Sequence, residues 1–281
     1  MFENVYACLV HESQECVVDL VRNLRCCDPE SPILLYDGSG TGLLTEHFPY
    51  DRYGAVIHPA SKPMHWGRLH DFALDSMKFC LETFKCDSMT IVDSDQLLIR
   101  PGYSAFLDRA ASQNRGAGMF VSDTSRHGPN TSNGPCKSAF GEINLWRPFL
   151  KLFPSGEEQF AYWTFWPGTV FLNSAIRDLV DRFNRDELLR EILETSKLWA
   201  TEEVIFPTLT RLLGYNLAQN PCRAEYVQYR AEYDTEHVRD ALTYSDQFWI
   251  HPVPRSYGDP VRTEIRDAVE QFGWVHGKIR F

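Results

Sequence analysis

The chain has 281 residues, of which 43% are hydrophobic and 13% aromatic, enough to bury one large core or two small cores that share an interface. Its formal net charge of −10 argues against nucleic-acid binding and against membrane binding through a basic surface. It does not exclude a phosphorylated small molecule, which needs only a few local cations or a metal. We therefore expect one domain with an elaborated second half.

The eight cysteines show no C-x-x-C spacing and lie mostly within apolar patterns. Such cysteines are typical of buried thiols in a reducing compartment rather than of a disulfide or zinc framework. The chain begins directly with a strand-like run, and no stretch approaches the roughly 18 apolar residues of a membrane-spanning helix. We expect a soluble, cytoplasmic protein without a transmembrane segment.

Strand and helix patterns alternate over the first part of the chain. Short apolar runs predict strands, and apolar residues at helical spacing predict amphipathic helices between them. The expected strands cover residues 5–10, 33–36, 53–58 and 89–92, and the expected helices cover residues 17–24 and 66–84. This alternation predicts a Rossmann-like α/β fold, with a mostly parallel central sheet, right-handed crossovers and flanking helices.

A glycine-rich turn follows the second expected strand. Asp37 ends the strand, and an acidic residue at this place can accept hydrogen bonds from a ribose or a base. Gly38, Gly40 and Gly42 would let the backbone approach a ligand closely. Their spacing differs from the G-x-G-x-x-G of dinucleotide-binding proteins. A flexible turn and a nucleotide contact therefore both remain open.

The triplet Asp93-Ser94-Asp95 interrupts the apolar run that forms the fourth expected strand. Two carboxylates at the carboxyl end of a buried strand face the crevice where open α/β sheets bind ligands. Such oxygen ligands suit Mg²⁺ or Mn²⁺ holding a diphosphate. We expect Asp95 to be the direct metal ligand and Asp93 to reach the ribose or a metal-bound water. The simpler alternative is a turn, because aspartate is common at strand ends.

The second half of the chain has a different composition. Residues 122–140 are rich in Ser, Asn, Gly and Pro, which predicts a long loop. An aromatic belt follows, and core packing is the simpler interpretation of it, with stacking on sugar rings as the alternative. The belt consists of Trp146, Phe149, Phe153, Phe160, Tyr162, Trp163, Phe165 and Trp166.

Further elements are expected in the second half. Besides a helix at 103–111 and a strand at 118–122, the patterns predict strands at 167–172 and 248–251 and helices at 176–183, 186–194 and 261–272. Thr201 is the expected N-cap of another helix, with Glu202 and Glu203 in its first turn, where the helix dipole favours negative charge. Pro207 predicts a kinked or 3₁₀ first turn there.

The strand order and the Asp93-Ser94-Asp95 triplet resemble a nucleotide-sugar glycosyltransferase of the GT-A fold. In that family the carboxylates of the triplet bind a divalent metal, which binds the diphosphate of the sugar donor. The chain more finely resembles the core-2/I-branching and xylosyltransferase group, at residues 6–11, at Trp66-Gly67 and at residues 201–206. That group lacks the full Asp-x-Asp triplet and has no proline at the position of Pro207. The prediction of a metal site therefore follows from the broader GT-A family, and the prediction of a catalytic base follows from the narrower group.

The resemblance implies roles for particular residues. Glu203 would be the catalytic base that removes the proton of the acceptor hydroxyl, with Glu202 as its neighbour. The residues expected to bind the donor are His11, Asp37, Trp66, Arg68, Asp93, Arg255 and Lys278. The residues expected to bind Mn²⁺ or Mg²⁺ are Asp95, Asp93 and His251.

Simpler alternatives exist for several of these residues. A helix-dipole role for Glu203, a core position for Trp66 and a solvated surface position for Arg68 need no chemistry. The resemblance also implies that residues 1–121 form the nucleotide-sugar-binding half, and that residues 122–281 form the acceptor half with a C-terminal closing segment.

We expect an inverting, metal-assisted glycosyltransferase that moves a sugar from a nucleotide-diphosphate donor to an acceptor hydroxyl. A nucleotidyltransferase that makes a nucleotide sugar is one alternative, although it predicts a glycine-rich, basic loop after the first strand, which His11-Glu12-Ser13 does not provide. A non-enzymatic glycan-binding module is another, motivated by the aromatic belt.

Overall fold

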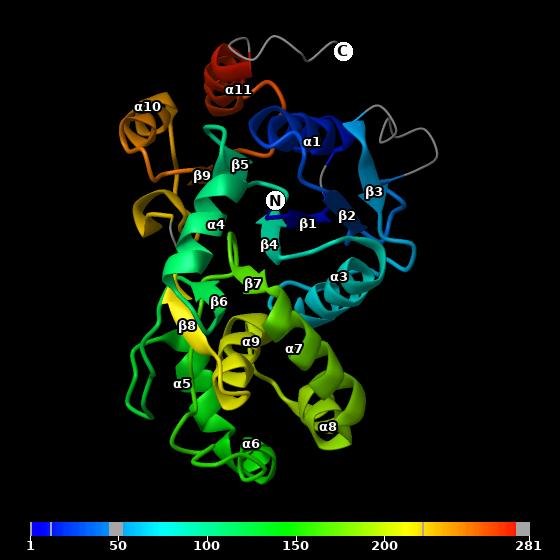
Figure 1. Ribbon diagram of the computed structural model, residues 1–281, viewed down its shortest axis with the longest axis vertical. Helices are drawn as coiled ribbons and strands as arrows, with labels where there is room; N and C mark the ends of the chain where they lie inside the picture. The colour runs from blue at the N-terminus through cyan, green and yellow to red at the C-terminus, as the bar shows by residue number, and fades with distance from the viewer. Residues whose placement is uncertain (1, 12, 45–52, 221, 274–281) are drawn as a thin grey trace.

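The computed structural model describes residues 2–11, 13–44, 53–220 and 222–273. Its centre is a seven-stranded sheet in the order β3-β2-β1-β4-β7-β6-β8 (Figure 1). The strands are β1 (Asn4–Val10), β2 (Ile33–Asp37), β3 (Ala55–Ile57), β4 (Ser88–Asp93), β6 (Ala117–Val121), β7 (Val170–Leu172) and β8 (Asn216–Gln219).

The sheet is mostly parallel. β1 pairs in parallel with β2 and β4, β2 with β3, and β6 with β8, whereas β7 runs antiparallel to both β4 and β6. The predicted α/β fold with a mostly parallel central sheet and flanking helices is therefore confirmed. In the described part of the chain, no helix has both the length and the apolar character needed to cross a membrane.

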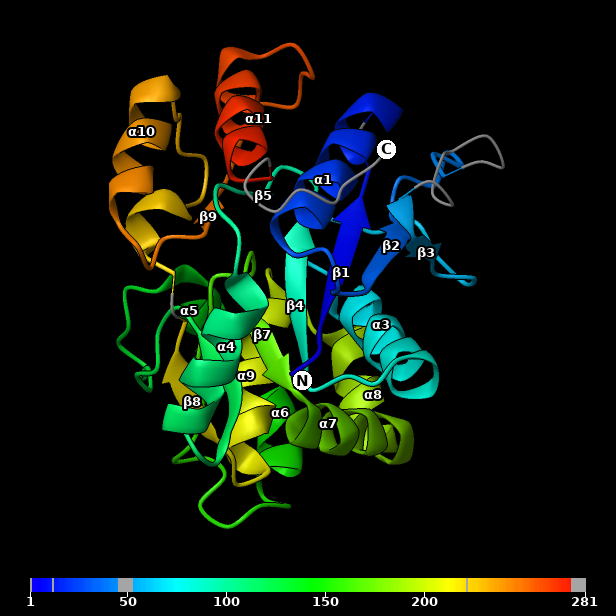
Figure 2. The same ribbon diagram turned by 45° about the horizontal axis from the view of Figure 1, so that its top comes forward.

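Helices form a layer on each face of the sheet. The core on one face includes α3 (His70–Thr83), α5 (Gly134–Gly141), α6 (Ile143–Leu150), α7 (Asn173–Arg185), α8 (Glu187–Thr195) and α9 (Thr201–Leu212). The core on the other face includes α1 (Gln14–Cys27), α4 (Tyr103–Gln113), α10 (Thr235–Thr243) and α11 (Pro260–Gly273). Figures 1 and 2 show α1, α10 and α11 gathered at one end of the molecule.

The central strand β1 shows why a buried parallel strand has a continuous apolar sequence. Alternate side chains enter opposite cores, with Val5, Ala7 and Leu9 on one face and Tyr6, Cys8 and Val10 on the other. Because helices cover both faces of the sheet, both sets of side chains are buried, and the strand does not alternate between apolar and solvated residues. All eight cysteines are free thiols, and most are buried, as expected.

Several elements were not expected from the sequence. The predicted loop at 122–140 ends early, because α5 begins at Gly134, with the Asn133 side chain accepting a hydrogen bond from the Cys136 N–H and Pro135 in the first turn. The asparagine cap followed by proline is a helix-start signal that the overall composition of the segment obscured.

The elements α6, α10, β8 and the 3₁₀ turn η1 (Ala224–Tyr226) were also not predicted. β8 comes from the second half of the chain but pairs with β6 from the first, so the central sheet draws on both halves. The division at residue 121 stays a prediction.

Candidate active site

Residues from two distant parts of the chain meet at the carboxyl end of β4. After Asp93 the chain turns sharply, because the Gln96 N–H donates to the Asp93 carbonyl oxygen (3.0 Å). The next strand, β5 (Leu97–Leu98), pairs with β9 (Trp249–Ile250) in a separate two-stranded sheet. This small sheet carries His251, which directly follows β9, to the two aspartates.

The strand order places this end of β4 at a switch point of the sheet. β2 and β4 lie on opposite sides of β1, so the direction in which the sheet is built reverses between β1 and β4. Open α/β sheets bind ligands outside the carboxyl ends of their strands at such a point. Asp93 is paired in register with Leu9, and His11 follows the end of β1.

A compact group of charged side chains lies at the switch point. Nε2 of His251 is 3.2 Å from Oδ1 of Asp95 and 3.7 Å from Oδ2 of Asp93. The guanidinium of Arg255 donates to Oδ2 of Asp95 through Nε (3.1 Å) and Nη2 (2.9 Å). Nδ1 of His251 lies 3.1 Å from the Gln228 carbonyl oxygen, and a proton on that nitrogen would leave Nε2 facing the carboxylates.

The three predicted metal ligands fit a divalent cation. Asp93, Asp95 and His251 each offer one ligand atom, and these atoms lie within 4.8 Å of one another. Oδ1 of Asp93 is buried and accepts no hydrogen bond from any residue that the structure describes. A buried carboxylate oxygen without a partner is unfavourable, and a cation would satisfy it. Two oxygens suit Mg²⁺ or Mn²⁺, and the imidazole favours the transition metal.

The two aspartates differ in their affinity for a proton. Burial raises the pKa of Asp93 to about 7, although the charge of His251 opposes this rise. Burial would also raise the pKa of Asp95, but hydrogen bonds and charges from His251 and Arg255 outweigh it and lower the pKa to about 2. The cationic neighbours therefore favour the ionised form of Asp95, whereas burial favours the protonated form of Asp93.

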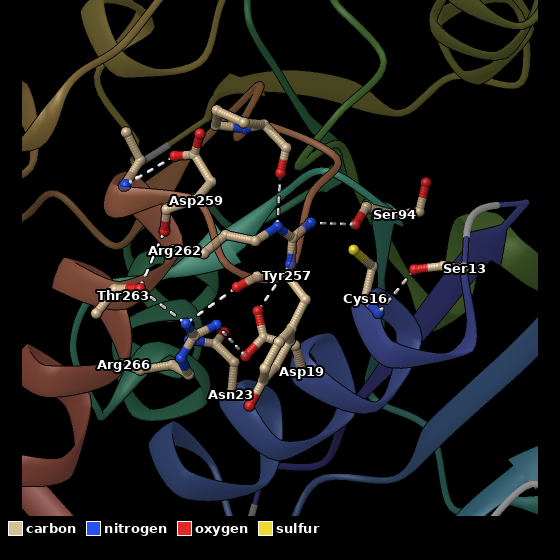
Figure 3. A network of polar contacts seen from close by, with 12 residues as sticks. Ser13, Cys16, Asp19, Asn23, Ser94, Tyr257, Asp259, Arg262, Thr263 and Arg266 are labelled. Carbon is tan, nitrogen blue, oxygen red and sulfur yellow. Dashed lines mark hydrogen bonds and ion pairs between the residues drawn. The ribbon is translucent and has the colours of Figure 1, made fainter.

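A buried ion pair supports the Asp93-Ser94-Asp95 turn through a contact with Ser94 (Figure 3). Nη1 of Arg262 on α11 lies 2.8 Å from Oδ2 of Asp19 on α1, and both side chains are buried. The same guanidinium donates to the carbonyl oxygens of Ser94 (3.5 Å) and Pro254 (2.6 Å). Arg262 therefore joins the aspartate turn to the segment that carries Arg255. Nothing in the local sequence pattern predicted this contact.

The second acidic pair lies at the start of α9, where the N-cap prediction is wrong. The N-cap is Ala200, with a φ of 57° and no side-chain cap bond, rather than Thr201. The chain enters the helix through a left-handed residue, so the Thr201 hydroxyl points to Oε2 of Glu202 instead (3.3 Å). The Leu69 N–H donates to the same oxygen (2.9 Å). Glu202 thus fastens the loop before α3 to α9.

Pro207 frees a backbone acceptor beside the candidate base. Residues 201–212 form one α-helix, and at its start the Glu203 N–H donates to the Ala200 carbonyl oxygen three residues earlier (3.2 Å), which is a 3₁₀-type bond. A kink in this turn stays a prediction. Proline lacks the N–H that would bond the Glu203 carbonyl oxygen, and the Thr164 N–H donates to it from outside the helix (2.9 Å). The neighbouring Trp163 donates its indole N–H to Oε2 of Glu203 (2.8 Å). Pro207 thus helps to place a hydrogen-bond donor on the Glu203 carboxylate.

The surroundings of Glu203 raise its affinity for a proton. Burial raises the pKa of Glu203 to about 8, the hydrogen bond from Trp163 opposes this rise, and the charges of Glu202 and Asp93 add to it. Burial also raises the pKa of Glu202, against the hydrogen bond from the Leu69 N–H. A carboxylate with a pKa near the working pH is suited to accept a proton from a substrate.

Of the residues predicted to bind the donor, His11 and Arg255 lie beside Asp95. Burial and the charge of Arg255 lower the pKa of His11, while Asp95 acts in the opposite direction. Lys278 lies outside the described residues. A donor role for each of these residues stays a prediction.

Asp37 and Arg68 make contacts that explain their positions without a ligand. Oδ1 of Asp37 accepts hydrogen bonds from the N–H (2.9 Å) and the hydroxyl (2.6 Å) of Ser39, so the carboxylate stabilises the glycine-rich turn. Nη2 of Arg68 donates to the carbonyl oxygens of Leu193 (2.9 Å) and Ser196 (3.0 Å) at the end of α8. These contacts favour structural roles for both side chains.

The aromatic belt mainly builds the core, as its simpler interpretation predicts. Trp146, Phe149, Phe160 and Trp166 are buried in the core on the α9 side of the sheet. Trp66, by contrast, is 63% exposed, so the alternative of a core position is wrong for this residue.

No model of a known protein family and no curated protein matches the chain. Among solved structures, it is similar to the galactosyltransferase LgtC in complex with donor and acceptor sugar analogs, with a TM-score of 0.45, 10% identity and coverage of 96% of each chain. An active-site mutant of LgtC gives a TM-score of 0.44, 10% identity and the same coverage. Staphylococcus aureus TarS 1–349 in complex with UDP gives a TM-score of 0.37, 12% identity and coverage of 64% of this chain and 49% of that chain. The resemblance to the core-2/I-branching group stays a prediction.

Proposed function

We propose that this protein is a glycosyltransferase that moves a sugar from a nucleotide-diphosphate donor to an acceptor hydroxyl. The observation that carries the proposal is the group of Asp93, Asp95 and His251 at the switch point of a mostly parallel sheet. The carboxylate of Glu203 supports it, because it lies close enough for the charge of Asp93 to raise its pKa. One site thus combines candidate ligands for a cation with a candidate base.

Asp93, Asp95 and His251 would hold Mn²⁺ or Mg²⁺, which when bound supplies positive charge for the diphosphate of the donor. Arg255 adds a second positive charge on the same side, because its side chain is held on Asp95 yet remains 52% exposed. His11, at the end of β1, completes the polar edge of the switch point. These residues would bind the leaving group, so they act on the donor half of the reaction.

Glu203 would act on the acceptor half. The acceptor oxygen forms a bond to the anomeric carbon while the bond from that carbon to the diphosphate oxygen breaks, and the hydroxyl proton passes to the Glu203 carboxylate. Attack from the side opposite the leaving group inverts the anomeric centre. The indole N–H of Trp163 would keep the receiving carboxylate oriented during this transfer.

Thermal-shift measurements test the proposal before the donor sugar is identified. The diphosphates of uridine, guanosine, cytidine and thymidine, and their diphospho-sugars, are each added with and without Mn²⁺. We expect one of the nucleotides to raise the Tm only when Mn²⁺ is present, and Asp93→Asn to lose this effect. Stabilisation that needs no metal would contradict the metal site, and no stabilisation by any nucleotide would contradict the proposed function.

A further inference from the structure

Three exposed aromatic side chains form a cluster on the surface. Trp66, Trp199 and Tyr229 are 63%, 42% and 48% exposed, and they come from three separate segments of the chain. The rings of Trp66 and Tyr229 are stacked, with centroids 6.1 Å apart and an interplanar angle of 13°. Trp199 meets Trp66 edge to face at 5.0 Å. We call these three residues the aromatic platform.

Each ring of the platform is followed by a residue with left-handed backbone. Gly67 has a φ of 75°, Ala200 of 57° and Arg230 of 54°. This conformation is unfavourable for alanine and arginine, and such strain is concentrated at functional sites. At Gly67 a Cβ would lie 2.9 Å from Cδ1 of Trp199, so glycine is needed for the two tryptophans to meet. The left-handed residues therefore hold the backbone in a conformation in which the three rings meet at the surface.

Hydrogen bonds connect the segments of the platform to segments that carry candidate active-site residues. The Thr201 N–H donates to the Gly67 carbonyl oxygen (3.1 Å), which joins the Trp66 loop to the turn that begins α9 and carries Glu203. On the other side, the residue before Tyr229 is Gln228, whose carbonyl oxygen lies 3.1 Å from Nδ1 of His251. Residues next to the platform in the sequence are thus bonded to the first turn of α9, which carries the candidate base, and to the candidate metal ligand His251.

We propose that the aromatic platform binds a pyranose ring of a saccharide acceptor and directs one of its hydroxyls to Glu203. The proposal rests on the proposed function and deepens it by naming the acceptor class. Aromatic faces carry partial negative charge and attract the weakly positive C–H groups of a sugar ring. Three rings match one or two sugar units in size, and the platform is fastened to the turn that carries the base, which must touch the acceptor.

Arg230 adds polar character to the platform. Its guanidinium carbon lies 4.9 Å from the centroid of the Tyr229 ring and 5.8 Å from that of Trp66. The guanidinium lies over these rings, and its N–H groups can donate to sugar hydroxyls while the ring faces that it leaves uncovered bind the C–H surface. An apolar surface with donors beside it suits a saccharide better than it suits a purely apolar partner.

Saturation-transfer NMR tests the proposal with lactose, cellobiose and N,N′-diacetylchitobiose as probes. Each disaccharide is titrated into the full chain with Mn²⁺ and the nucleoside diphosphate that gives the largest thermal shift. We expect at least one disaccharide to bind, with the saturation transferred to its ring protons. Trp66→Ala and Tyr229→Ala should each weaken the affinity for that disaccharide by about fivefold. Tyr229→Phe keeps the ring and should keep most of the affinity, and substitution of an exposed apolar residue outside the platform, Leu152→Ala, should leave the affinity unchanged.

The outcomes separate this proposal from the proposed function. Unchanged saccharide binding in both alanine variants, or no binding of any disaccharide to a protein that binds the diphosphate, would overturn the platform and leave the proposed function standing. If Trp66→Ala weakens binding of the diphosphate and leaves binding of the saccharide unchanged, the platform binds the nucleobase and the proposal is wrong. If the wild type binds saccharide but no diphosphate, the donor site fails and the platform remains. The Tm of each variant shows that it is folded.

Discussion

The Asp93/Asp95 pair and the Glu202/Glu203 pair consist of the same chemical group in two different surroundings. Cationic side chains contact Asp95 and lower its pKa to about 2, while burial raises the pKa of Asp93 to about 7. Neutral N–H and O–H donors contact the glutamates, and the pKa of Glu203 rises to about 8. Burial acts on both pairs, and at Asp95 the hydrogen bonds and charges of the cationic side chains outweigh it.

This difference assigns one task to each pair. Carboxylates beside cationic groups and with an unsatisfied oxygen can hold a further cation against a diphosphate. A carboxylate kept away from cations retains its affinity for a proton and can take one from a hydroxyl. Arg255 binds Oδ2 of Asp95, while Oδ1 of each aspartate is buried and accepts no hydrogen bond from a described residue. Both aspartates therefore keep an oxygen for a metal, and Glu203 keeps its affinity for a proton.

The largest expected effect is that of Glu203→Gln. The amide cannot accept a proton, so we expect the rate of transfer to fall by about 10²- to 10⁴-fold while the affinity for the diphosphate stays the same. Release of the nucleoside diphosphate during turnover measures the first, and calorimetry the second. Glu202→Gln is the matched control, because its amide oxygen can still accept the Leu69 N–H. Equal loss in both variants, or unchanged turnover in Glu203→Gln, would contradict the assignment.

The next effect concerns the support of the aspartate pair. Arg262→Met leaves Arg266 as the remaining ion-pair partner of the buried Asp19 among the described residues, and it removes the donors to Ser94 and Pro254. Breaking a buried pair typically costs about 3–5 kcal/mol of unfolding free energy, which denaturant titration measures. We also expect weaker binding of the diphosphate, because the turn at Ser94 loses its anchor.

Arg239→Met is the control for that variant. It breaks the pair between Arg239 and Glu264 on the surface, where solvent screens the charges, so stability should change little. Similar destabilisation by the two substitutions would show that the Asp19–Arg262 pair has no special role.

The smallest expected effect is a dependence on pH. Glu203 must be ionised to accept a proton, and its pKa is about 8, so the rate of transfer should rise up to tenfold per pH unit below pH 8 and level off above it. A test without substrate uses stability. The folded state holds the Glu203 proton more tightly than the unfolded state, so the unfolding free energy should fall as the pH rises from about 4.5 to about 8.

Glu203→Gln isolates this contribution from other groups that titrate in the same range, such as Asp93. The difference in unfolding free energy between the wild type and the variant should change with pH in that window. A difference that stays constant from pH 5 to pH 8 would mean that Glu203 has an ordinary pKa.

The sequence predicts the parts of this site that depend on local pattern. A continuous apolar run revealed β4 because both faces of a central parallel strand are buried, and Asp93 and Asp95 stand out at its end. His251 was proposed as a late-chain residue on a segment that can fold over the donor site, and the structure places it directly after β9. The mostly parallel sheet followed from the same alternation of runs and helices.

The sequence does not predict contacts between distant residues. Asp19 and Arg262 are 243 positions apart, and neither belongs to a motif. The effect of Pro207 depends on a donor from Thr164, which the local rule for proline could not predict. The aromatic platform joins rings from three segments, and its left-handed residues include an alanine and an arginine, which give no local signal for that conformation.

Calorimetric titration of the best-stabilising nucleoside diphosphate tests the central claim most directly. It compares the wild type in Mn²⁺, the wild type in EDTA, and Asp93→Asn in Mn²⁺. We expect binding in the first case and at least about tenfold weaker binding in the other two, because Asp93 contributes an unsatisfied oxygen to the proposed metal site. Equal affinity in all three would show that neither a metal nor Asp93 takes part in binding the donor.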